Sequence, residues 1–101
     1  MTIDEQSVNR TDVFERVKKV LISMLKIFRE KKAESRPMLS METHLIDDLG
    51  VDSLETLDIM NALEDEFQVS PNLNEVNSKR KLGQIVDYVI ELQNKKSIKR
   101  S

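Results

Sequence analysis

Residues 45–67 in the middle of the chain read LIDDLGVDSLETLDIMNALEDEF. Gly50 interrupts this run, and Asp52 is followed three positions later by Glu55. An acidic N-cap followed by Glu at that spacing is a close variant of the capping box that starts helices. We therefore predict that a helix begins at Ser53, directly after an Asp52 cap, and runs to about residue 68.

The predicted helix has two faces on a wheel that advances about 100° per residue. One sector is mostly apolar and forms the expected core stripe, which holds Thr56, Ile59, Met60, Ala62, Leu63 and Phe67. The opposite sector sets two leucines among acids, and it comprises Leu54, Asp58, Asn61 and Asp65 with Leu57 and Glu64 at its flanks. Single exposed leucines are common on protein surfaces. Two leucines surrounded by carboxylates, one turn from a capped serine, predict a docking strip for partner proteins.

Ser53 is interpreted as a point of attachment and not as a catalyst. At the first position of a helix its side chain should be exposed and close to unpaired backbone N–H groups. A phosphodiester there would meet the positive end of the helix dipole. The only histidine, His44, lies in a preceding turn without an evident orienting partner, which disfavours a Ser-His-Asp arrangement.

Helices are predicted on both sides of this central element. Apolar residues recur at three- and four-residue spacing from Val13 to Phe28, which predicts a helix over residues 12–32 with Thr11 as its N-cap. A connecting loop over 33–43 contains Pro37, and a short turn is expected near 43–49.

The C-terminal part of the chain predicts one short and one long helix. Ser70-Pro71 marks the start of a short helix over 71–77. The last helix is expected from residue 78 or 81 to 94. The fold class is therefore all-α, a small bundle of three main helices plus one short helix. Residues 1–10 are expected to be a disordered lead-in, 11–94 one folded domain, and 95–101 a basic tail.

Composition excludes several classes of protein. A chain of 101 residues fits one domain, and few aromatics with 39% hydrophobic residues suit an aliphatic helical core. There is no cysteine, so any thiol chemistry needs a cofactor that brings its own sulfur. The polar residues 1–10 lead us to expect no secretory signal, and no apolar run reaches the length of a membrane span. We expect a cytoplasmic monomer without a metal site.

Charge is strongly segregated along the chain. Residues 37–78 contain ten acidic residues and no Lys or Arg, whereas residues 79–101 contain seven basic residues and two acids. A negative field of this kind steers cationic partners. The acidic middle opposes contact with phosphates, and aromatic platforms are lacking, so nucleic acid is not an expected partner.

The run from Leu45 to Leu54 resembles the signature of acyl carrier proteins. The likeness continues through the rest of the central helix, at Glu55, Asp58, Ala62, Leu63, Glu64, Asp65, Glu66 and Phe67. Residues 15–20 (ERVKKV) resemble the first helix of that family, and residues 86–89 (VDYV) resemble its last. The resemblance implies an acyl-carrier-like bundle and identifies residues 11–94 as the carrier domain.

The resemblance also implies a function and a prosthetic group. A phosphopantetheinyl transferase would move 4'-phosphopantetheine from coenzyme A onto Ser53, next to Asp52, and the terminal thiol would hold acyl intermediates as thioesters. The protein itself would be a non-catalytic carrier. Acyl-transfer and synthase enzymes of fatty-acid, lipid or specialised acyl biosynthesis would present basic patches to a docking face made of Leu54, Glu55, Leu57, Asp58, Asn61, Glu64 and Asp65. The acyl chain would enter the bundle along Leu45, Ile59, Met60, Leu63, Leu82 and Ile85.

Some features depart from the family pattern, and they leave alternatives open. The connection before Ser53 is longer than usual, Lys79-Arg80-Lys81 replaces an apolar residue and threonines, and the tail is basic. A specialised carrier is therefore as credible as a general fatty-acid carrier. A D-alanyl carrier stays open, while Val51-Asp52 argues against an aminoacyl or peptidyl carrier. A calcium loop fails because Gly50 stands where a ligand to the ion is required.

Overall fold

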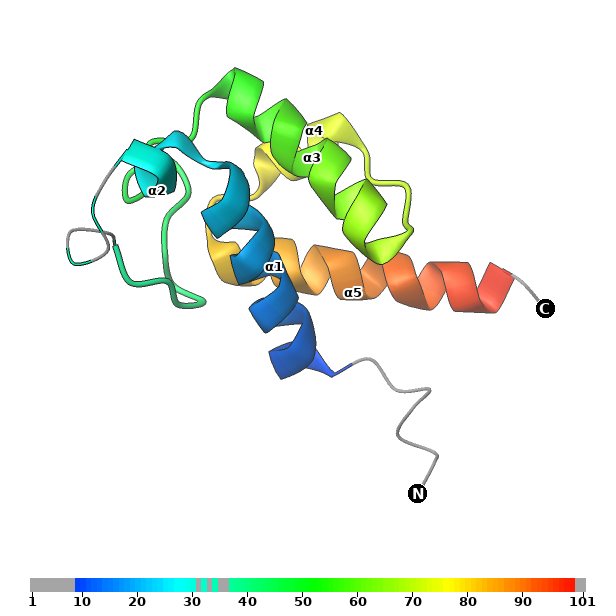
Figure 1. Cartoon of the computed structure of the whole chain (residues 1–101). Coiled ribbons are helices and arrows are strands. Elements are labelled where there is room, and N and C mark those ends of the chain that lie inside the picture. The colour runs from blue at the N-terminus through cyan, green and yellow to red at the C-terminus, as the bar shows by residue number, and fades with distance from the viewer. Residues whose placement is uncertain (1–8, 31, 33, 35–36, 100–101) are drawn as a thin grey trace.

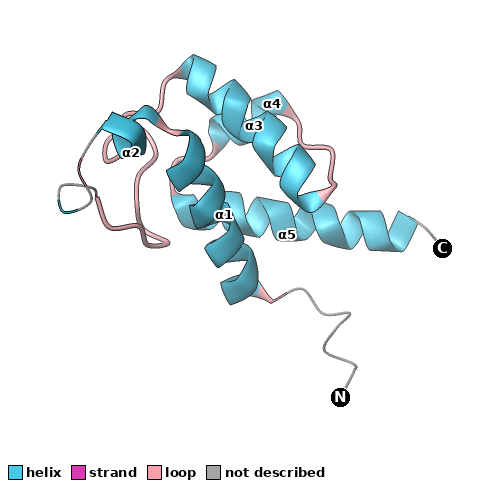
Figure 2. Ribbon diagram, viewed as in Figure 1, coloured by secondary structure: helices cyan, strands magenta, loops and turns pink. Residues whose placement is uncertain are grey.

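A computed structural model describes residues 9–30, 32, 34 and 37–99. The helices in chain order are α1 (Arg10–Met24), α2 (Lys26–Glu30), α3 (Ser53–Phe67), α4 (Leu73–Ser78) and α5 (Leu82–Lys99). Figures 1 and 2 show α1, α3 and α5 as the long elements, with a long connection between α2 and α3 and no strand in the described segments. The prediction of a small all-α bundle is confirmed, and the helix predicted over 12–32 is divided at Leu25 into α1 and α2.

The first helix begins earlier and ends earlier than predicted. Asn9, and not Thr11, is the N-cap, because its side chain accepts hydrogen bonds from the N–H groups of Thr11 and Asp12 at 2.9 and 3.2 Å. Helix α1 stops at Met24 since Leu25 adopts an extended conformation (φ −77°, ψ 139°). Asn9 and Arg10 therefore belong to the helical domain, whereas the rest of the predicted lead-in, residues 1–8, lies outside the described residues.

The long helices share one apolar core. Buried side chains from α1, α3 and α5 meet in it, among them Val17, Leu21, Ile59, Leu63, Leu82, Val86 and Val89. Arg16 fastens α1 to the end of α3: its guanidinium lies 4.5 Å from the centroid of the Phe67 ring and donates to the side chain and the carbonyl of Glu66, each at 2.9 Å. This contact fixes the C-terminal end of α3. Ser53 lies at the opposite, N-terminal end of the same helix.

The connection before Ser53 is held against the start of α5 by three backbone hydrogen bonds. Gly83 N–H donates to the Met41 carbonyl and Leu82 N–H to the Thr43 carbonyl, both at 2.9 Å. Leu45 N–H donates to the Arg80 carbonyl at 2.8 Å. The contacts of Leu82 and Gly83 satisfy N–H groups that the start of α5 leaves free. They also fix the segment that leads into Ser53.

The last two helices differ in their bounds from the prediction. Asn72, and not Ser70, caps α4, accepting from the N–H groups of Asn74 and Glu75. Its own N–H donates to the Tyr88 hydroxyl at 2.9 Å, which ties α4 to α5. Helix α5 continues to Lys99, so residues 95–99 are helical where a separate tail was expected, and residues 100–101 lie outside the described part of the chain.

Candidate functional site

A tight turn delivers the chain to Ser53. The His44 carbonyl accepts from Asp48 N–H and the Ile46 carbonyl from Gly50 N–H, both at 2.9 Å. Gly50 has φ +67°, a left-handed conformation that favours glycine. The turn thereby places Val51 in the core and brings Asp52 to the helix start.

Asp52 caps α3 as predicted. Its Oδ1 accepts a hydrogen bond from Glu55 N–H at 2.8 Å, and its carbonyl accepts from the Thr56 hydroxyl at 3.0 Å. Ser53 is then the first residue of α3, and it is exposed. Within the described residues no hydrogen bond engages the Ser53 hydroxyl. The structure thus presents a free hydroxyl at a capped helix start.

Glu55 does not lie on the outer face where the sequence analysis placed it. It is 8% exposed, and its Oε2 accepts a hydrogen bond from Lys26 N–H, the first N–H of α2, at 3.0 Å. Glu55 precedes Ile59 by four residues and therefore shares the core side of α3. The helical spacing between Glu55 and Ile59 could have indicated this position, but the acidic side chain suggested that Glu55 lies on the surface.

The other predicted docking residues do lie on the surface. Leu54 is 73% exposed and Leu57 39% exposed. The four polar members of the strip are exposed as well, namely Asp58, Asn61, Glu64 and Asp65. α3 therefore presents an outer face of carboxylates and two leucines, headed by Ser53.

His44 is engaged within its own turn. Its Nδ1 accepts from Asp47 N–H at 3.0 Å, and its Nε2 lies 3.7 Å from Asp47 Oδ2. No hydrogen bond joins His44 to Ser53 in the described part of the chain. Among the described residues, the Ser53 hydroxyl is therefore not activated by His44.

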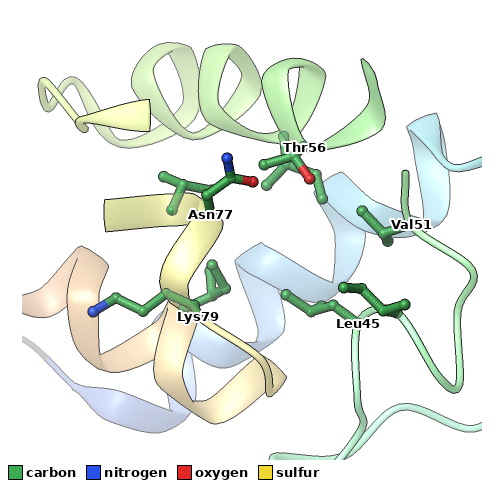
Figure 3. A pocket seen from close by; sticks show the side chains of 9 residues that line it. Leu45, Val51, Thr56, Asn77 and Lys79 are labelled. Atoms are coloured by element: carbon green, nitrogen blue, oxygen red, sulfur yellow. The ribbon is translucent and has the colours of Figure 1, made fainter. Parts of the chain in front are cut away.

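A small pocket opens between α3 and α4 (Figure 3). Leu45, Ile59 and Ile85 line it as predicted, whereas Leu63 and Leu82 are packed in the core and Met60 is partly buried against it. The sequence analysis missed six lining residues, which are Ile46, Val51, Thr56, Val76, Asn77 and Lys79. In Figure 3 the Lys79 ammonium points away from the pocket, so its stem forms the wall there. Thr56 comes one turn after Ser53, and this i, i+3 spacing was the available signal.

The size of the pocket limits what it holds in this state. Its volume is about 30 Å³, and a cavity needs roughly 10–15 Å³ of such space for one water molecule. The pocket in this state is therefore too small for an alkyl chain of several carbons.

No helix in residues 9–30 or 37–99 combines the length and the apolar character needed to cross a membrane.

Comparisons with known proteins agree with this geometry. The family model described as "Phosphopantetheine attachment site" matches residues 15–89. An acyl carrier protein of Clostridium acetobutylicum is 34% identical over 77 residues, which cover 76% of this chain and 91% of the relative. An acyl carrier protein of Campylobacter lari is 31% identical over 81 residues, covering 80% and 96%. This chain therefore belongs to the acyl carrier protein family, whose members are carriers with a covalently attached 4'-phosphopantetheine.

Proposed function

We propose that Ser53 carries the 4'-phosphopantetheine arm and that the protein presents acyl groups on this arm to partner enzymes of acyl metabolism. The observation that supports the assignment is an exposed, unengaged serine hydroxyl as the first residue of a capped helix. The arm supplies the thiol that the chain lacks, and acyl groups are held on it as thioesters.

The surroundings of Ser53 suit a phosphodiester. The first N–H groups of a helix have no intrahelical partner, and the helix dipole favours negative charge at that end. Asp52 occupies the Glu55 N–H and leaves the outside of the turn open. The group attached to Ser53 can therefore project into solvent, where a phosphopantetheinyl transferase and the acyl-handling enzymes can reach it.

The pocket between α3 and α4 is the proposed entry for the acyl chain. Thr56 forms part of its rim and lies on the same side of α3 as Ser53. Its inner wall is aliphatic, with Leu45, Ile59 and Val76 buried around it. Burial of a CH₂ group gains roughly 0.8 kcal/mol, which offsets the cost of opening the bundle as the chain lengthens.

The attachment is tested by intact-mass measurement after incubation with coenzyme A, magnesium and a broad-specificity phosphopantetheinyl transferase. We expect one pantetheinyl adduct on the wild-type chain and none on Ser53→Ala. Ser70→Ala, which removes another exposed serine shortly before a helix, is the matched control and should load like wild type. An adduct on Ser53→Ala, or none on the wild type, would overturn the proposal.

A further inference from the structure

An open groove runs between α2 and the first two turns of α3, beside the attachment site. Its walls come from Met24, Lys26 and Arg29 on one side and from Asp52, Leu54, Glu55 and Asp58 on the other. Its volume is about 230 Å³, far larger than that of the pocket between α3 and α4. We refer to these seven residues as the α2–α3 groove.

The two walls of the α2–α3 groove carry opposite charges. Lys26 and Arg29 stand on the α2 side, and Asp52 and Asp58 on the α3 side. Lys26 Nζ is 4.0 Å from Asp52 Oδ2, at the outer limit of an ion pair, and its side chain is 56% exposed. Arg29 is exposed and makes no ion pair with any other described residue. Both cations are thus available to a partner.

The fold holds these cations in a fixed place. α2 is anchored by buried Phe28 and by the Glu55 carboxylate, which accepts from Lys26 N–H at 3.0 Å. Lys26 and Arg29 are three residues apart and therefore lie on one side of α2. The break at Leu25 redirects the chain here, so that α2 borders the docking face of α3.

We propose that the docking surface of this carrier extends from α3 into the α2–α3 groove, and that its partners combine an acidic side chain with their basic patch. The acidic side chain faces Lys26 and Arg29, a basic one faces Asp58, and an apolar side chain packs between Met24 and Leu54. The inference rests on the proposed carrier function and adds the charge pattern of the partner. Opposite charges on two sides of a groove fix the orientation of a partner and disfavour surfaces of one sign.

The test compares kcat/KM for loading of the wild-type chain and of the double variant Lys26→Glu/Arg29→Glu. Both are loaded by the same phosphopantetheinyl transferase, chosen because it modifies the wild-type chain. We expect a decrease of roughly five- to ten-fold at low salt, which shrinks as added salt screens the charges. Lys19→Glu/Arg80→Glu is the control, since it makes the same change of net charge at exposed positions outside the groove. It should stay within about two-fold of wild type.

Further variants separate docking from folding. Lys26→Gln/Arg29→Gln removes the cations without adding acids beside Asp52, and it should give a smaller decrease in kcat/KM. Lys26→Arg/Arg29→Lys should restore loading to near the wild-type rate. A rate for the Glu variant equal to or above that of the control would overturn the inference, because the partner surface opposite α2 would then be neutral or basic. The mass measurement on wild type and Ser53→Ala tests the carrier function and does not depend on Lys26 or Arg29. A failure of the carrier function is therefore distinguished from a failure of this inference.

Discussion

Ser53 and Glu55 are two residues apart, yet one side chain is exposed and the other is buried. Ser53 faces solvent at the helix start, while Glu55 turns into the bundle and binds the first N–H of α2. A carboxylate in a buried position is retained only where hydrogen bonds compensate for its desolvation. Glu55 therefore connects the placement of α2 to the start of α3 at Ser53, and the α2–α3 groove depends on it.

Replacement of Glu55 tests this role. Glu55→Ala removes the part-buried hydrogen bond from Lys26 N–H to a charged carboxylate, and a bond of this kind contributes about 1.5–3 kcal/mol to the free energy of unfolding. Glu55→Gln keeps an acceptor oxygen and should lose less. Urea denaturation followed by circular dichroism measures both. Glu64→Ala, exposed on the same helix, is the control and should change stability by roughly 0.5 kcal/mol or less. A loss for Glu55→Ala no larger than that of the control would contradict the anchoring role.

Among the helices, boundaries set by neighbouring residues were predictable from the sequence, and boundaries set by packing between distant segments were not. The start of α3 followed from Gly50, Asp52 and Glu55, which act within a few residues of one another. The break between α1 and α2 at Leu25 has no Gly or Pro to indicate it in the sequence. The chain turns at this position because Leu25 is fully buried and because Glu55, thirty residues later, accepts a hydrogen bond from Lys26 N–H. Only three of the nine residues that line the pocket were predicted, partly because α4 supplies Val76 and Asn77 through packing between helices, which no local signal indicates.

An ion pair whose effect depends on pH joins the connection before α3 to Lys81, the residue before α5. Lys81 Nζ donates to Glu42 Oε1 at 2.9 Å. This hydrogen bond and, secondly, the charge of Lys81 hold the pKa of the Glu42 carboxyl below its ordinary value of 4.5. The same contact raises the pKa of Lys81 above 10.5. The stabilisation is thus present between these ordinary values, and it is lost as pH falls through the lowered pKa of Glu42 or rises through the raised pKa of Lys81.

Lys81→Met should therefore unfold at a slightly lower temperature than wild type near pH 7, since exposed pairs contribute little. The difference in Tm should close as the pH falls below the ordinary value of 4.5 and through the lowered pKa of Glu42, where this carboxyl becomes protonated in both proteins. Thermal unfolding monitored by circular dichroism over this pH range measures it, with Lys19→Met as a control at an exposed lysine on α1. A Tm difference that persists unchanged into acid would show that Lys81 acts through packing and not through Glu42.

Across the part of the chain that the structure describes, basic residues of α1 pair with acids of the other long helices, while the acids on the outer face of α3 make no such pair. Arg10 and Arg16 pair with Asp87 on α5 and Glu66 on α3 at 2.8 and 2.9 Å. Among the described residues no ion pair involves Asp58, Glu64 or Asp65. The net charge of only −2 therefore conceals a field that is concentrated on the outer face of α3. Such a field raises association rates with basic surfaces, and salt weakens it.

Reversal of two charges on this face should reveal the field. For Asp58→Lys/Asp65→Lys we expect kcat/KM with a phosphopantetheinyl transferase to fall by about ten-fold or more at low ionic strength, mainly through slower association. The ratio of wild-type to variant rates should approach one as salt rises, because the Debye length shortens from about 10 Å at 0.1 M to 3 Å at 1 M. Glu15→Lys/Glu91→Lys makes the same change of net charge on α1 and α5 and controls for charge alone. If the control lowers the rate as much as the α3 variant does, net charge and not the outer face of α3 governs docking.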